Sequence, residues 1–144
     1  MSDNDLVNDI LESVSLNPHT LSQDTAHLVV HGNKVVSSAR LPGLHVDVEE
    51  TDEGINAEIR LDPGTVIEKP VHLCFGLMPE EGRQRIGMKV RTGDDSRIGL
   101  MAHCTFPNAV DVEHIMDAEI DISPGSVYEY FERHVHGSEG GVVV

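Results

Sequence analysis

The sequence predicts a mostly β chain, built as a stack of repeats, with a short helix at its N-terminus. Apolar and polar residues alternate from about residue 26 onward, turn signals interrupt them roughly every 10–15 residues, and no helical pattern separates the strands. A unit of about 30 residues also recurs, opened by Gly64-Thr65-Val66, Asp95-Ser96-Arg97 and Gly125-Ser126-Val127. Such a period is typical of a solenoid, in which each unit buries its face by stacking on the next. A sandwich and a small barrel also fit the strand pattern.

The first residues carry a helical pattern. Apolar residues fall on one face at helical spacing, and they are Leu6, Val7, Ile10, Leu11 and Val14. Asn17-Pro18 ends the pattern, because proline disfavours the helical conformation in the residue before it. We expect a helix over about Asp5–Leu16.

A β-hairpin is expected next. His27–Val30 and Val35-Val36 flank the turn His31–Lys34. Leu41-Pro42-Gly43 is a further turn and the best candidate boundary. The sequence therefore predicts an N-terminal helix and hairpin appendage over residues 1–41 and a repeating body over residues 42–144.

Half-buried strands make up the predicted body. Val66–Phe75 is expected to be a strand in which Pro70 marks an edge or bulge. Glu80–Gln84 is expected to be a solvated loop, because it is charged and contains Gly82. The other strands are expected around Val46–Val48, Ile55–Leu61, Ile86–Val90, Ile98–Cys104, His114–Ile122 and Val127–His136.

Composition limits the possible partners and compartments. The 144 residues carry a net charge of −15, with a pI near 4.7, so we expect neither nucleic acid nor an anionic membrane as a partner. No apolar run approaches the roughly 20 residues of a membrane span, and the N-terminus lacks the features of a secretory signal. The chain has only two cysteines, Cys74 and Cys104, which favours a reduced cytoplasm.

The pair His134-Val135-His136, followed by Glu139, is the first candidate metal site. Residues i and i+2 of a strand point to the same face, so the two imidazoles could share an ion with Glu139 as a third ligand. This is how metal sites of the cupin type are built. However, the interval from Gly125 to His134 and the interval from His136 to Glu139 both miss the cupin spacing.

His72-Leu73-Cys74 and His103-Cys104 could supply softer ligands for zinc or an iron–sulfur cluster. If a repeat were one turn of a solenoid, then His72, His103 and His134 would lie roughly in a column. The spacing varies by a residue, however, and one residue moves a side chain to the other face. Two cysteines also fall short of the four thiolates of an ordinary cluster. His103, Cys104, His134 and His136 remain as metal-ligand candidates, and no catalytic motif is found, so we expect a protein that is not an enzyme.

Several segments resemble the SufB/SufD family, the scaffold components of the SUF machinery for iron–sulfur cluster assembly. They cover about Pro63 to Val144, and they are Ile67–Gly76, Ala102–Ala109, His114–Ile120, Pro124–Tyr130 and Glu132–Val142. The resemblance implies a right-handed parallel β-helix, in agreement with the period of about 30 residues. It also implies a cytoplasmic complex with a SufC-like ABC-type ATPase and a second SufB/SufD-like chain.

In the family, the chain continues well beyond the His-x-His-Gly motif, and the residues credited with cluster assembly lie in that later part. We therefore expect this chain to be the N-terminal portion of such a scaffold, either cut short at its C-terminus or a stand-alone short relative that has lost the assembly function. No cluster ligand is assigned to any residue here. A transient iron–sulfur cluster is expected only with a partner chain or with the missing C-terminal sequence.

Overall fold

The computed structural model describes residues 3–13 and 25–144. One helix and ten strands occur in these ranges. In chain order they are α1 (Asp3–Ser13), β1 (His27–His31), β2 (Lys34–Ala39), β3 (Leu44–Glu50), β4 (Gly54–Leu61), β5 (Val71–Gly76), β6 (Glu81–Thr92), β7 (Arg97–Phe106), β8 (Asp111–Ile122), β9 (Val127–His136) and β10 (Val142–Val143).

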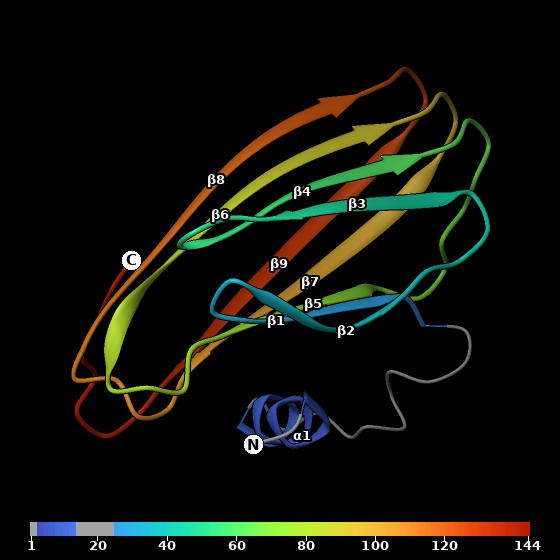
Figure 1. Ribbon diagram of the computed structural model, residues 1–144. Helices are drawn as coiled ribbons and strands as arrows, with labels where there is room; N and C mark the ends of the chain where they lie inside the picture. Colours follow the sequence, from blue (N-terminus) through green and yellow to red (C-terminus); the bar gives the residue numbers. More distant parts are fainter. Residues whose placement is uncertain (1–2, 14–24) are drawn as a thin grey trace.

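The strands form two facing sheets, and the chain alternates between them (Figure 1). Sheet A has the order β2-β1-β5-β7-β9, and sheet B has the order β10-β8-β6-β4-β3. From β4 onward each strand pairs in parallel with the strand one turn later: Glu81 lies opposite Asp111, and Arg97 lies opposite Val127. The molecule is thus a parallel β-helix of about three turns, which confirms the expected architecture and excludes the sandwich and the small barrel.

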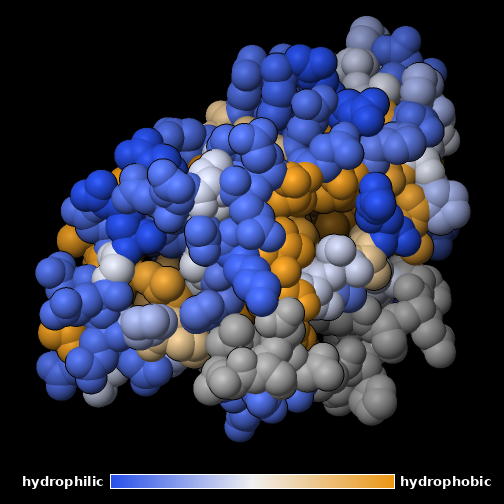
Figure 2. Space-filling view, in the orientation of Figure 1, coloured by the Kyte–Doolittle hydropathy of each residue, from blue (hydrophilic) through white to orange (hydrophobic). Residues whose placement is uncertain are grey.

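Alternation along each strand sends every second side chain into the space between the sheets. In β4, for example, Ile55, Ala57 and Ile59 point inward and are almost fully buried. Stacked aliphatic side chains from all turns form one core, to which Phe75 and Phe106 add aromatic rings. In Figure 2 hydrophobic residues show between hydrophilic outer surfaces. This arrangement suits a sequence with few aromatic residues, because thin layers of Val, Ile and Leu fill the interior.

The helix α1 lies against the outer face of sheet A (Figure 1). Ile10 and Leu11 are buried there against Val29 and Cys74. The helix begins two residues earlier than expected, and residues 14–16 of the expected helix lie outside the described residues.

The expected hairpin is confirmed as the antiparallel pair β1–β2. It also continues sheet A, because β1 pairs in parallel with β5, where His27 lies opposite His72. The hairpin therefore belongs to the same sheet as the repeating turns.

Two strand boundaries differ from the sequence prediction. The strand expected over Val66–Phe75 begins only at Val71, since Pro70 has no amide hydrogen to donate to a neighbouring strand. The loop expected over Glu80–Gln84 is wrong for residues 81–84, which begin β6. There Arg83 lies opposite Glu113 of β8, and its guanidinium Nε donates to the carboxylate at 2.6 Å. Charged residues on an outer face were thus mistaken for a loop.

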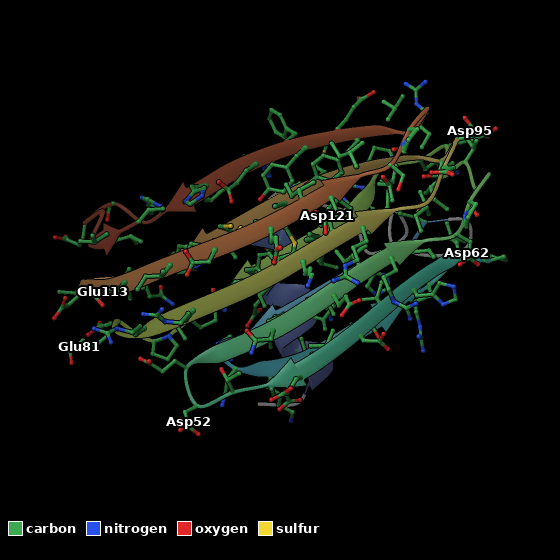
Figure 3. All side chains as sticks on the ribbon, turned by 90° about the horizontal axis from the view of Figure 1, so that it is seen from above. Asp52, Asp62, Glu81, Asp95, Glu113 and Asp121 are labelled. Atoms are coloured by element: carbon green, nitrogen blue, oxygen red, sulfur yellow. The ribbon has the colours of Figure 1, made fainter. Side chains whose placement is uncertain are left out.

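Acidic residues dominate the outer face of sheet B and its turns (Figure 3). Basic side chains of β6 interrupt the negative charge and pair with β8, as in Lys89–Glu119 at 3.9 Å and Arg91–Asp121 at 3.7 Å. In the described part of the chain, no helix is long and apolar enough to cross a membrane.

Candidate functional site

Polar side chains replace aliphatic ones inside the β-helix where β7, β8 and β9 face one another. Cys104 of β7 lies opposite His134 of β9, and Glu132 lies two residues before His134 on the same inward face. The ligand atoms of Cys104, Glu132 and His134 all lie within 4.8 Å of one another. We call these three residues the lumen triad. A thiol, a carboxylate and an imidazole thus meet on the inward face of sheet A, where Cys104 is buried, His134 is half-buried and Glu132 is exposed.

Cys104 is fully buried, whereas Glu132 and His134 are partly accessible. Burial raises the pKa of the Cys104 thiol, and the nearby Glu132 carboxylate raises it further, so the thiol is protonated near neutral pH. Its Sγ lies 4.0 Å from Glu132 Oε1. The same carboxylate accepts a hydrogen bond from the Tyr130 hydroxyl at 3.0 Å and lies 3.4 Å from His134 Nε2. Glu132 therefore connects the members of the triad.

His114 of β8 faces the triad from sheet B. Its ring centroid lies 5.7 Å from that of His134, and only 1% of its surface is exposed. Burial is the main cause that lowers the pKa of His114 to about 4, so the ring is neutral near neutral pH. Its Nδ1 lies 3.1 Å from Oε1 of the buried Gln84, while its Nε2 is buried without a hydrogen-bond partner.

The surroundings of these polar groups are aromatic and open on one side. Phe106 packs against both His114 and His136, with centroid distances of 4.9 and 6.1 Å. A hollow of about 320 Å³ adjoins the triad. Glu132 and His114 line it together with Met88, Met116, Tyr128 and Tyr130.

Of the residues proposed as ligands from the sequence, Cys104 and His134 come together, and His136 lies beside His134 with a centroid distance of 5.8 Å. His103 does not join them, because it follows the opposite face of β7. There it stacks on His72 at a centroid distance of 5.3 Å and an interplanar angle of 9°. The column expected from His72, His103 and His134 is therefore not formed.

The reason is the register. His103 and His134 are 31 residues apart, but β7 and β9 pair at an interval of 30, as in Cys104 opposite His134. The one-residue difference moves His134 to the inner face.

The structure brings together only part of the cupin-type ligand set, His134, His136 and Glu139. His134 and His136 share a face as expected, but Glu139 follows the end of β9 and is absent from the triad of ligand atoms. Among the described residues, Glu132 takes the carboxylate position that the sequence analysis gave to Glu139. The i, i+2 rule that linked His134 to His136 also applies to Glu132 and could have identified it. Gln84 and His114 lie on other strands, so no local pattern pointed to them.

Comparison with known proteins gives the family. No family model matches the chain. A protein of Methanocaldococcus jannaschii, described as an iron–sulfur cluster assembly SufBD family protein, is 32% identical over 117 residues, which are 81% of this chain and 37% of that protein. A protein of Pyrococcus horikoshii with the same description is 27% identical over 129 residues, or 90% of this chain and 40% of that protein. The chain thus spans less than half the length of these relatives. Together with the β-helix, this similarity identifies the chain as a member of the SufB/SufD family.

Proposed function

We propose that this chain is part of a scaffold on which iron–sulfur clusters are assembled. The observation that carries the proposal is the similarity to two proteins described by that role, which extends over four fifths or more of the chain. In this proposal the chain is not an enzyme. It contributes a stiff β-helix and holds no cluster by itself.

The proposed partners are a SufC-like ATPase and a second SufB/SufD-like chain, in the cytoplasm. The β-helix supports a scaffold role, because its parallel strands are bonded to both neighbours in the inner turns and so form a stiff framework. Of the two described thiols, Cys104 of the lumen triad is the one that belongs to a group of three adjacent metal-binding side chains.

The test is reconstitution of this chain with and without a SufC-type ATPase. Under anaerobic conditions, ferrous iron and sulfide are supplied, and the desalted protein is analysed for iron, for sulfide and for visible absorbance. We expect co-elution of the two proteins in gel filtration and cluster retention only in the complex. A complex that forms but retains no iron and sulfide would contradict the assembly role and leave an interaction module. Failure of the two proteins to associate would contradict the proposed ATPase partner.

The cupin-type alternative predicts a different result. A stoichiometric metal that is lost on His136→Ala but kept on Cys104→Ala would favour it. The geometry does not favour it, because Glu139 lies outside the set of adjacent ligand atoms.

A further inference from the structure

We infer that the lumen triad is a binding site for a single divalent transition-metal ion. His114, whose ring nitrogens lie outside the set of adjacent ligand atoms, comes within reach as a fourth ligand when the ion draws the side chains together. Cys104, Glu132 and His134 already place a sulfur, an oxygen and a nitrogen atom within 4.8 Å of one another. One sulfur, one oxygen and two imidazole nitrogens form a donor set that suits four-coordinate zinc or ferrous ions.

Charge supports the same conclusion. A thiolate at Cys104 and the carboxylate of Glu132 carry two negative charges, and His114 and His134 bind as neutral imidazoles. A divalent cation makes the occupied site neutral, which offsets the cost of a thiolate at the buried Cys104. Binding replaces the S–H bond of Cys104 by a metal–sulfur bond, and the thiol proton is released to solvent.

The tautomer of the His114 ring is a second observation that supports the metal site, and it does not depend on the distances within the triad. The amide nitrogen of Gln84 donates to the carbonyl oxygens of Gly32 and Gly76, at 3.0 and 3.1 Å. Carbonyl oxygens only accept hydrogen bonds, so the amide cannot be turned around, and its Oε1 must face His114. His114 Nδ1 is therefore the donor, which leaves the lone pair on Nε2.

That lone pair is buried and has no hydrogen-bond partner, and the His114 ring that carries it lies 5.7 Å from the ring of His134, centroid to centroid. Metal-binding histidines commonly have their second nitrogen fixed by a hydrogen bond in this way. Gln84 thus holds His114 in the tautomer that a metal ion needs.

The inference deepens the proposed function, on which it rests only for the identity of the ion. If the chain serves iron–sulfur assembly, then ferrous iron is the physiological occupant. The existence of the site follows from the residues alone, so it can be tested without an ATPase, without sulfide and without a cluster.

Cobalt(II) is the probe, because a thiolate bound to cobalt gives an intense charge-transfer absorption band that other ligands do not give. The full chain is freed of metal, reduced and titrated with cobalt(II). We expect one ion per chain, with the thiolate band. The band should disappear in Cys104→Ser and in Cys104→Ala. It should persist in Cys74→Ser, the matched control, since Cys74 is the other buried thiol but lies on the opposite face of sheet A beneath α1.

Further variants test the other ligands. Glu132→Gln changes a partly exposed side chain and should weaken cobalt binding by at least about tenfold with an unchanged circular dichroism spectrum. His114→Gln should weaken it comparably.

Absence of the band in the wild type, or its loss in Cys74→Ser to the same extent as in Cys104→Ser, would overturn the inference. Unchanged affinity in Glu132→Gln or in His114→Gln would remove that residue from the site and overturn the four-ligand arrangement. Cobalt binding without cluster assembly would contradict the proposed function and leave the metal site supported. Cluster assembly in the complex without cobalt binding by the chain would overturn the metal site and leave the proposed function supported.

Discussion

The two faces of sheet A carry two histidine clusters with different surroundings. On the outer face, His72 and His103 stack on each other, and Nδ1 of one lies 3.1 Å from Nε2 of the other. On the inner side, His134 stands beside a thiol and a carboxylate, and His114 of β8 faces it from sheet B. In the outer pair one nitrogen of each ring faces the other ring, and Nδ1 of His103 is buried without a hydrogen-bond partner. The inner set instead brings unlike donor atoms, a sulfur, an oxygen and a nitrogen, close together. Histidine recurrence in a sequence is thus a weak guide to chemistry, because the neighbours on the same face decide what the rings can bind.

Removal of the aromatic ring beneath the inner set should have the largest effect. Phe106 is fully buried against His114 and His136. We expect Phe106→Ala to lower the free energy of unfolding by about 3–5 kcal/mol, measured by urea denaturation. Phe131→Ala is the control, since Phe131 of β9 is 57% exposed, and it should change stability by no more than about 0.5 kcal/mol. If both variants lost the same free energy of unfolding, then packing on the inner face would contribute no more to stability than packing on the outer face.

Substitution of one member of the outer pair should have a moderate effect on stability and none on metal binding. His103→Ala leaves His72 Nδ1 without its partner in a largely buried position, which should cost about 1–3 kcal/mol. Cobalt titration of His103→Ala should match that of the wild type, while His134→Ala should lose affinity. If His103→Ala also abolished the thiolate band, the separation between the two faces would be wrong.

Acid should destabilise the outer face. Burial lowers the pKa of His31 and of His72 below the ordinary value of 6.5, so the unfolded chain binds protons at a higher pH than the folded chain does. Stability should therefore fall as the pH drops through about 6.5 and should keep falling until the folded-state pKa values are reached.

His31→Gln tests this dependence on pH. His31 Nε2 accepts a hydrogen bond from the Met78 amide at 3.1 Å, and glutamine can accept the same bond without titrating. Thermal melts in EDTA between pH 7.5 and 5 should show a smaller loss for the variant. An equal or larger loss in the variant would exclude His31 as a source of the effect.

The smallest effect is expected on the exposed part of the outer face. Arg97 pairs with Glu129 across β7 and β9 at 3.1 Å, but both side chains are more than half exposed. Arg97→Gln should change the free energy of unfolding by less than about 1 kcal/mol, and added salt should reduce the difference further. A loss of several kcal/mol in urea denaturation would mean that this ion pair is much less hydrated than its exposure indicates.

The sequence was sufficient for the fold and insufficient for most of the site. Alternation and the repeat of about 30 residues indicated a stack of strands, because both follow directly from strand geometry and parallel pairing. Cys104 and His134 were identified by residue type. Glu132 was missed although it lies two residues before His134, and His114 was missed because its approach depends on how sheet B folds over sheet A. Gln84 carries no sequence signal at all, since its importance lies in the two carbonyl oxygens that fix its amide.

The pairing interval of 30 residues between β7 and β9 also limits which mutations such a protein can accept during evolution. Replacing one amino acid alters the character of a side chain but leaves it on its face. Inserting or deleting one residue in the turn Ser123–Ser126 would instead exchange the inward and outward sets of β9, turning Glu132 and His134 outside and Phe131 and Arg133 inside. Lineages of this family should therefore tolerate many substitutions along β9 and few changes in the length of that turn.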